Sequence, residues 1–590
     1  MDMKKRFPSW LEPLFFILIL GTALLITSRF HQGKGYFNWK SEIWSDKAGY
    51  YIYLPATLYY HWDLKACPQK MDERTGYGFV YEQSKGKIKT DFTYGVAFLL
   101  SPFFVATHSI TKIAGIPQDW AFAPVYHKMA DVASVFYLAL GLFLLFRFLR
   151  KYFSERSSYI TVLILFAGTG LFYYSVIDTL MSHVYSFFLV SLFLLFLKKF
   201  LDDTSKRLYL LVFILTFAFA VLIRPSALML VFVLLFLDVS SRAAFIERLK
   251  LIFKPGNIGL LVLVNLIVWL PQMAYNHYLT GDFIVLPSQP EMFPNLFSPR
   301  LPELWFSTLN GLFMYTPLMI LVVAGIVMMV RRKETNGLMS MFIFLLMSYI
   351  FASWWCWYFG CAFGQRSFTD FLPLLGIPLA YLVEQCNFSA NKMRAVVIAI
   401  LILFFCWFNV RVSYAYEGCF FGSAWDWNQY GKLLNSSGLW PVKPGFSHHN
   451  DYENLSIANG GTTTSLVSRS RDHSLLFDKD HEFNSSFFEY PDKMKQSGPL
   501  KKLKVNFYIF RTGGSATGAF LVCDIKKDGK QILYESRPLD VPMARTREWY
   551  VVPANFDMPA NLDPWAEVRI YIWNKSKTTF YVDDFDINTE

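Results

Sequence analysis

The sequence contains few charged residues for its length. Only 17% of its 590 residues are Asp, Glu, Lys or Arg, whereas 54% are hydrophobic. Soluble globular domains carry about 25% charged residues. The shortage excludes a wholly soluble protein and indicates a chain largely surrounded by lipid.

Cysteine pairs with zinc-ligand spacing are also missing. The seven cysteines are scattered, without any C-x-x-C motif; Cys356, Cys361 and Cys419 could face an oxidising compartment, and their pairing stays open.

The net charge of +11 comes mostly from Lys and Arg in short loops between apolar segments, so we expect no nucleic-acid partner. We predict no cofactor and no metal ligands, and leave a divalent metal open.

Long apolar runs dominate the first 412 residues. About twenty apolar residues in a helix cross about 30 Å of hydrocarbon. On this basis we predict a polytopic α-helical membrane protein with about eleven spanning helices, at residues 11–28, 122–147, 159–176, 182–198, 208–223, 225–239, 257–275, 312–330, 338–354, 368–385 and 394–412.

Lys and Arg predict the orientation of these helices. They concentrate near residues 4–6, 147–156, 198–207, 242–254, 331–333 and 392–394. The short loops on the opposite side contain only Arg224 and Arg366. Because positive loops stay in the cytoplasm, we predict a multi-pass protein of the inner (plasma) membrane with a cytoplasmic N-terminus.

Two apolar segments, one at the N-terminus and one at residues 92–110, have an alternative to a simple membrane span. Met1 to Arg6 and the run after them resemble a signal peptide, but no convincing cleavage site follows, so we predict an uncleaved first helix. Phe92 to Ile110 is apolar enough to span, yet spanning would place the 147–156 loop outside. We therefore predict that it lies along the outer surface, which leaves the C-terminus periplasmic or extracellular.

The polar tail predicts a second domain. Residues 503–510, 568–573 and 579–587 alternate apolar and polar side chains and are separated by turn residues, a pattern typical of an antiparallel β-sandwich. We divide the chain into a membrane domain at 1–415, with a first outer loop at 29–121, a linker at 416–440 and a sandwich at 441–590.

The strongest candidate for a catalytic residue is Asp46, in the stretch Asp46-Lys-Ala-Gly-Tyr50-Tyr51 shortly after the first helix. An ionisable group beside the membrane is costly unless it has a function. Asp46 could act as a general base on an acceptor hydroxyl, or it could be a solvated loop acid or a helix cap. Tyr50 and Tyr51 are candidate sugar or acceptor contacts.

Basic residues on the outer side are candidates for binding a donor phosphate. Arg366 and Arg224 depart from the charge trend of their face, and Arg binds phosphate through two donors; they could instead snorkel to lipid headgroups. Lys87 and Lys89 form a second basic cluster, which could also contact anionic headgroups.

Three further polar residues are candidate acceptor or sugar contacts. Asp91 opens the predicted surface segment, and Asp178 and His183 lie in a short outer hairpin between two helices. Ionisable residues at such interfaces are site candidates. The other interpretation is that short turns need polar residues.

The order of these features resembles the GT-C superfamily of membrane glycosyltransferases, in particular the group of protein O-mannosyltransferases and the lipid A aminoarabinose transferase. The resemblance covers roughly residues 10–415. It is carried by the first helix and Asp46-Lys-Ala-Gly-Tyr-Tyr, followed by Asp91-Phe-Thr-Tyr-Gly-Val-Ala, Ser182-His183, Arg224-Pro225 and Gly364-Gln-Arg366.

The resemblance implies a polyprenyl-phosphate sugar donor, an inverting transfer, and usually no metal for monosaccharide donors. Asp46 matches the catalytic acid of the first loop, and Arg224 and Arg366 loosely match the basic residues that contact phosphate. Lys47 follows Asp46 where some relatives have an Asp-Glu pair, which leaves the acceptor type open. The tail resembles carbohydrate-binding-module sandwiches at Tyr571-Ile-Trp-Asn574 and Phe580-Tyr-Val-Asp-Asp584.

Three functions are compatible with these patterns. The leading one is a cell-envelope glycosyltransferase, a hexosyl- or pentosyltransferase, which moves a sugar from a polyprenyl-phosphate donor to a glycan, lipid or protein acceptor on the outer face. The second is a transporter or flippase of lipid-linked sugars, although transporters usually show internal repeats and we see none. The third is a non-catalytic, glycan-binding membrane scaffold.

Overall fold

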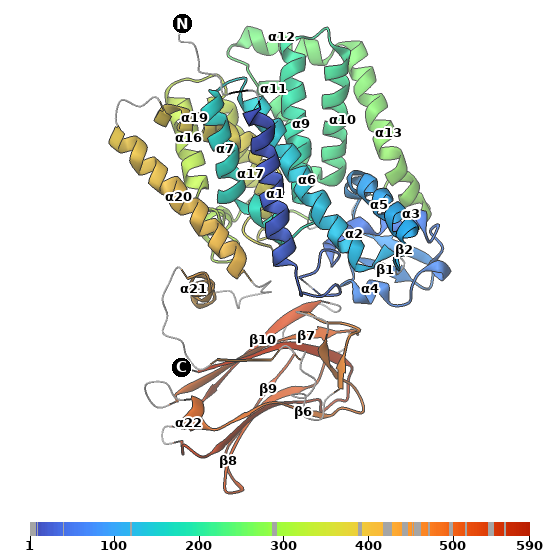
Figure 1. Cartoon of the computed structure of the whole chain (residues 1–590), viewed down its shortest axis with the longest axis vertical. Helices are drawn as coiled ribbons and strands as arrows, with labels where there is room; N and C mark the ends of the chain where they lie inside the picture. Colours follow the sequence, from blue (N-terminus) through green and yellow to red (C-terminus); the bar gives the residue numbers. More distant parts are fainter. Residues whose placement is uncertain are drawn as a thin grey trace.

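A computed structural model of the chain consists of a helical bundle and a C-terminal pair of β-sheets (Figure 1). It describes residues 8 to 589 except 9, 39, 119–120, 286–291, 361, 388–391, 417–426, 439–446, 451, 453–461, 470–472, 495–499, 514–515, 541–547 and 560–561. Cys361 and Cys419 lie outside the described residues.

Every apolar run predicted to span contains a helix, because a helix satisfies its own backbone hydrogen bonds where no water is available. The main helices of the bundle are α1 (Leu11–Phe30), α6 (Pro124–Leu149), α7 (Glu155–Gly168), α9 (Ser182–Asp202), α10 (Arg207–Ile223), α11 (Leu230–Phe236), α13 (Pro255–Thr280), α16 (Met319–Arg331), α17 (Gly337–Ser353), α19 (Leu372–Asn387) and α20 (Lys392–Ala415).

Six helices in the described part of the chain are long and apolar enough to cross a membrane, or seven if the bent pair formed by α7 and its continuation is one span. They are α1, α5 (Gly95–Ala114), α6, α9, α13 and α20. Five shorter apolar segments lie at 207–223, 225–236, 319–331, 337–353 and 372–386. The chain is therefore a polytopic helical membrane protein, and the count of eleven crossings stays a prediction.

Several helices break at one end of the bundle. After α7 the chain bends by 70° into α8 (Gly170–Phe172) and a π-helical turn, η3 (Tyr173–Ile177). Other short elements of the bundle are η4 (Pro225–Met229), α12 (Arg242–Ile252), α14 (Leu301–Phe306), α15 (Leu312–Tyr315) and α18 (Arg366–Thr369). Among these elements α12 lies at the opposite end, whereas η3 and α18 bring polar residues to the sheet end (Figure 1).

The basic loops cluster at the opposite end of the bundle. Arg147 lies 2.9 Å from Glu12, at the start of α1, and Lys151 lies 3.4 Å from Asp202, at the end of α9. The start of α1 and helix α12 are at this end, whereas the sheets are at the other (Figure 1). The arrangement groups the loops as the positive-inside pattern requires.

The first outer segment forms a compact layer at the sheet end of the bundle. It contains α2 (Asp46–Tyr51), α3 (Tyr53–Leu58), η1 (Leu64–Ala66), α4 (Met71–Arg74), β1 (Phe79–Glu82), β2 (Lys87–Thr90) and α5. Helix α5, which includes most of the predicted surface segment, lies beside α2 and α3 at this level (Figure 1). It also meets the length and hydropathy criteria for a span, so its surface position stays a prediction.

The tail forms two antiparallel sheets, and each of the three predicted runs is a strand. One sheet contains β3 (Ser447–Asn450), β4 (Thr462–Thr464), β5 (Ser474–Phe477), β7 (Lys502–Arg511), β10 (Trp549–Asp557) and β12 (Phe580–Thr589). The other contains β6 (Phe483–Glu489), β8 (Phe520–Lys527), β9 (Lys530–Pro538) and β11 (Glu567–Trp573). The remaining helices are α21 (Trp427–Ser436), inside the predicted linker, and α22 (Pro491–Met494).

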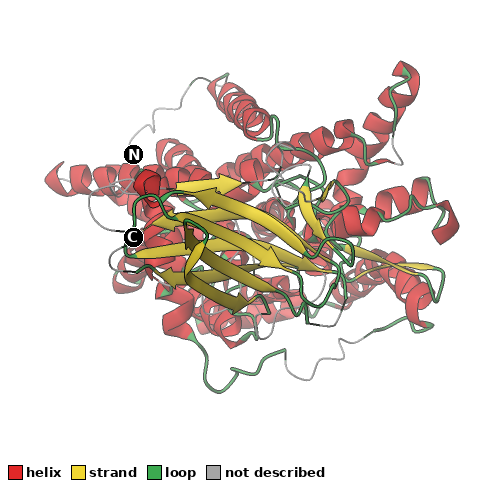
Figure 2. Ribbon diagram, turned by 90° about the horizontal axis from the view of Figure 1, so that it is seen from below, coloured by secondary structure: helices red, strands yellow, loops and turns green. Residues whose placement is uncertain are grey.

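The core between the two sheets is built from alternating residues. In β11, Val568, Ile570 and Ile572 are buried, while the residues between them face outward. Seen from the sheet side, the strands lie across the helices of the bundle (Figure 2).

The sandwich packs against the first outer segment through the sheet that contains β7, β10 and β12. The Tyr77 ring stacks on Phe510 with centroids 5.7 Å apart, and Trp44 belongs to the same apolar cluster as Trp549. The Ser468 hydroxyl donates a hydrogen bond of 3.1 Å to the carbonyl oxygen of Phe37. The sandwich therefore contacts the chain two residues before Asp46.

Candidate active site

Asp46 is the first residue of α2, and the loop before it is conformationally strained. Ser45 has φ 49°, a value uncommon for a residue other than glycine. The strain is held in place because the Ser45 N–H donates to the Thr75 carbonyl over 2.8 Å, and because Gly78 packs closely. A Cβ on Gly78 would lie 1.7 Å from the Ser45 carbonyl oxygen. Strained backbone of this kind is often found at functional sites.

Asp46 faces Arg366 across a separation of 320 residues in the sequence. The Nη1 of Arg366 lies 3.5 Å from the Oδ2 of Asp46. The Asp46 side chain is 35% exposed and that of Arg366 17%, so the acid lies on the accessible side of the pair.

Arg366 remains a cation with an available donor. Burial would lower the pKa of its guanidinium, but the charge of Asp46 and nearby Tyr174 raise that pKa above its usual value. Its Nε is buried and has no hydrogen-bond partner among the described residues. A phosphate oxygen is the type of acceptor that suits such a group.

A second buried network lies next to this pair. The Nε of Arg224 donates to the Oδ2 of Asp370 over 3.1 Å, and its Nη2 lies 3.4 Å from the Ser367 hydroxyl. The other carboxylate oxygen of Asp370 lies 2.8 Å from the Nδ1 of His183. Arg224 and His183 are thus both tied to the segment that begins with Arg366.

Tyr50 connects α2 to α9. Its hydroxyl donates to the Ser182 hydroxyl over 3.2 Å. Burial, and then the charge of Asp46, raise the pKa of Tyr50, so the phenol stays neutral and keeps its proton. Tyr51, the neighbouring candidate, donates instead to the Ala121 carbonyl over 2.5 Å and packs against Phe122, which makes it part of the local core.

Asp178 pairs with Lys47, the residue that follows Asp46. The Lys47 Nζ lies 2.6 Å from the Asp178 Oδ1. Asp178 directly follows η3, so the pair joins α2 to the bent end of α7 and α8.

The remaining candidates lie on the β1–β2 hairpin and just after it. Lys87 donates to the Leu279 carbonyl at the end of α13 over 3.2 Å. Lys89 pairs with Asp91 at 3.5 Å, and the Asp91 side chain is 82% exposed. None of the contacts found for these three residues in the described part of the chain reaches Asp46 or Arg366.

Sequence reasoning missed four members of the site: Lys47, Ser182, Ser367 and Asp370. Asp370 carried a usable signal, because it is an acid at the start of an apolar run predicted to span, where an unpaired charge is costly. Lys47 was counted only as a departure from the Asp-Glu pair. Ser182 entered only through the Ser182-His183 motif of the resemblance, and Ser367 carries no comparable signal.

The fold and site together define a polytopic membrane protein with an acid and two arginines clustered at the bundle end that the sandwich covers. The chain matches no family model and no curated protein.

Several solved structures show some likeness to the chain. ArnT from Cupriavidus metallidurans bound to undecaprenyl phosphate is 14% identical over 72% of this chain and 74% of ArnT, with a TM-score of 0.40. Arabinosyltransferase EmbB from Mycobacterium smegmatis is 10% identical over 100% of this chain and 66% of EmbB, with a TM-score of 0.33.

The third likeness concerns the tail. The CBM22-1 xylan-binding domain of Paenibacillus barcinonensis Xyn10C is 13% identical over 25% of this chain and 97% of that domain, with a TM-score of 0.18.

Proposed function

We propose that this protein is an integral membrane glycosyltransferase. It transfers a hexosyl or pentosyl group, with inversion, from a polyprenyl-phosphate donor to a glycan, lipid or protein acceptor on the outer face. The observation that supports this most is the pairing of Asp46 with Arg366, where a partly exposed acid meets a largely buried cation with an unused donor.

In this proposal Asp46 is the general base. Its carboxylate accepts the proton of an acceptor hydroxyl, and the hydroxyl oxygen forms a bond to the anomeric carbon of the sugar. The bond between that carbon and the phosphate oxygen breaks on the opposite face, and polyprenyl phosphate leaves. One displacement of this kind inverts the anomeric centre.

Arg366 stabilises the leaving phosphate, whose negative charge grows as the bond breaks. Arg224 supports it from the adjacent network, and its contact with Ser367 makes it a better partner than the Lys87 and Lys89 cluster. Arg224 also neutralises Asp370, which would otherwise repel the phosphate.

The sandwich contributes acceptor recognition in this proposal. Its four-stranded sheet faces away from the bundle (Figure 1). The rings of Phe483 and Trp573 lie parallel there, with centroids 5.9 Å apart, and Phe483 is exposed. Exposed apolar surface rimmed by polar residues often marks a binding site, and sugar rings can stack on such a surface.

The transporter alternative has less support. Transporters place their binding sites near the middle of the membrane in broken helices. The network around Asp46 lies instead at the sheet end of the bundle, where α2 and α18 are outside the candidate spans.

The test is Asp46→Asn, which preserves size and hydrogen bonding but removes the base. Turnover with a polyprenyl-phosphate sugar and a membrane fraction as acceptor source should fall by about a hundred- to ten-thousand-fold. Donor binding in lipid nanodiscs should change little. Asp63→Asn, at an exposed capping acid, is the matched control and should stay near wild type. Near wild-type transfer by Asp46→Asn would refute the assignment of Asp46 as the base, whereas absence of transfer by the wild-type protein would leave the scaffold alternative.

A further inference from the structure

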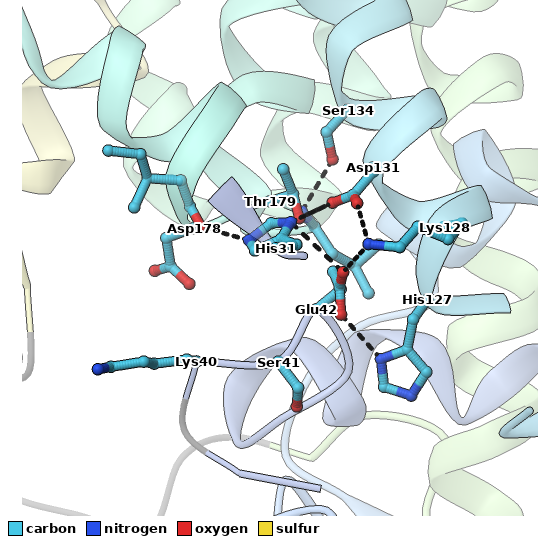
Figure 3. Close-up of polar contacts among 12 residues, drawn as sticks. His31, Lys40, Ser41, Glu42, His127, Lys128, Asp131, Ser134, Asp178 and Thr179 are labelled. Atoms are coloured by element: carbon cyan, nitrogen blue, oxygen red, sulfur yellow. Dashed lines mark hydrogen bonds and ion pairs between the residues drawn. The ribbon is translucent and has the colours of Figure 1, made fainter. Parts of the chain in front are cut away.

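A second polar cluster lies where α1 ends, and the proposed transfer reaction does not use it. His31, Glu42 and Asp131 are all buried there (Figure 3). The His31 Nδ1 lies 2.9 Å from the Asp131 Oδ1 and 3.3 Å from the Glu42 Oε1. We propose that these three side chains form a binding site for one divalent transition-metal ion, with Zn²⁺ as the best fit.

The orientation of His31 is the first argument. Its Nε2 lies 2.9 Å from the carbonyl oxygen of Ile177, which can only accept, so Nε2 carries a hydrogen. The Nδ1 therefore points at two carboxylate oxygens, which places three potential metal-ligand atoms side by side. A ligating histidine typically donates its other N–H to a carbonyl in this way.

Hydrogen-bond partners outside the three candidate ligands also fix the two carboxylates. The Thr179 hydroxyl donates to Asp131 over 2.8 Å, and the Nδ1 of His127 lies 3.1 Å from the second oxygen of Glu42. Outer contacts of this kind fix the direction of metal ligands. The candidate ligands are thus preorganised by residues of α6 and of η3 with the turn after it.

The distances suit a small ion. Four ligands at about 2.0–2.2 Å around tetrahedral Zn²⁺ are about 3.3 Å apart. The three candidate ligand atoms all lie within 4.8 Å of one another, so only small shifts would be needed. One imidazole nitrogen and two carboxylates favour Zn²⁺ over Mg²⁺ or Ca²⁺, which prefer oxygen ligands alone.

Lys128 is the competitor for this site. Its Nζ lies 3.2 Å from Glu42 and 3.3 Å from Asp131, and its side chain is 39% exposed. The ammonium of Lys128 supplies one positive charge beside the two carboxylates. A divalent ion supplies two, and Lys128 can then turn toward solvent.

Metal content of the full-length protein tests the proposal without any assay of sugar transfer. After treatment with a chelator, dialysis against ZnCl₂ and gel filtration, about one Zn²⁺ per chain should remain by mass spectrometry. Co²⁺ in its place should give the visible absorption of a low-symmetry site. His31→Gln and Asp131→Asn should retain at least tenfold less Zn²⁺, while His61→Gln, at an exposed histidine, should bind like wild type.

Lys128→Met separates the metal site from an ion network that needs no metal. It keeps all three ligands and removes the competing charge, so its Zn²⁺ affinity should rise about tenfold or more. If neither wild type nor Lys128→Met retains Zn²⁺, or if His31→Gln retains as much as wild type, the proposal is wrong.

Discussion

Lys47 and Asp178 form a close ion pair between the first outer segment and the turn after η3, with 2.6 Å between the Nζ and the Oδ1. Only 5% of the Lys47 side chain is exposed. Because Lys47 follows Asp46 directly, the pair also fixes one end of α2. The position of the proposed base therefore depends on a contact made 131 residues further along the chain.

Removing one partner of this pair should be costly. Asp178→Asn leaves a buried ammonium without its counter-charge, and breaking a buried pair this way costs about 3–5 kcal/mol. We expect a matching loss of stability in chemical unfolding of the detergent-solubilised protein. Lys47→Met combined with Asp178→Leu should recover most of it.

The same double variant separates structure from chemistry. If it is stable but inactive, activity needs the pair either to position Asp46 or to contact a substrate; if it is stable and active, the pair is structural. An Asp178→Asn protein as stable as wild type would contradict the burial argument.

Arg366→Ala should weaken binding of a polyprenyl-phosphate sugar. Losing a hydrogen bond to a charged group costs about 1.5–3 kcal/mol, which corresponds to roughly ten- to hundredfold in Kd. Arg224→Ala should have a smaller effect, because its Nε is already bonded to Asp370.

Donor titration in nanodiscs measures the Arg366 effect. Arg300→Ala, at an exposed arginine paired with Glu303, is the control and should bind donor normally. Unchanged donor affinity in Arg366→Ala would remove Arg366 from the phosphate site.

Gly78→Ala should disturb Asp46 without touching it. The new Cβ would meet the Ser45 carbonyl at 1.7 Å, so the Ser45 backbone must move. We expect turnover to fall at least tenfold while the protein still folds, because near-attack geometry tolerates shifts of about 1 Å poorly. Gly259→Ala, where no atom lies within 4 Å of the added carbon, should keep full activity. If Gly78→Ala and Gly259→Ala had equal turnover, the reaction would not depend on the position of the Ser45 backbone.

The charge pattern predicts which ends face the cytoplasm. A reporter active only outside, fused after Glu590, should give signal, and a cysteine replacing Lys151 should be labelled only once the membrane is permeabilised. Labelling of that cysteine from outside intact cells would reverse the topology, and a cytoplasmic signal from Glu590 would change the number of crossings.

Apolar periodicity predicted the helices and strands well because each is decided by neighbours in sequence. It missed their interruptions: the run at 312–330 is split into α15 and α16 around Pro317, and the run at 159–176 bends after Gly168. Proline and glycine at these points allow breaks, but only tertiary packing decides whether they occur.

The sequence predicts several residues of the site, but it does not predict which of them contact one another. Asp46, Arg224 and Arg366 stood out by position and charge, and the structure brings them into one neighbourhood. The contacts of Lys47 with Asp178 and of His31 with Asp131 join residues that are 131 and 100 positions apart, and no local pattern encodes them.

The π-helical turn η3 makes the length of its segment as important as its composition. A π turn holds one residue more than the α turn it replaces. Deleting that residue would rotate everything after it by about 100°. The Ile177 carbonyl, Asp178 and Thr179 would then all leave His31, Lys47 and Asp131 together. Point substitutions here can be absorbed one contact at a time, whereas a single-residue deletion would disconnect three elements at once.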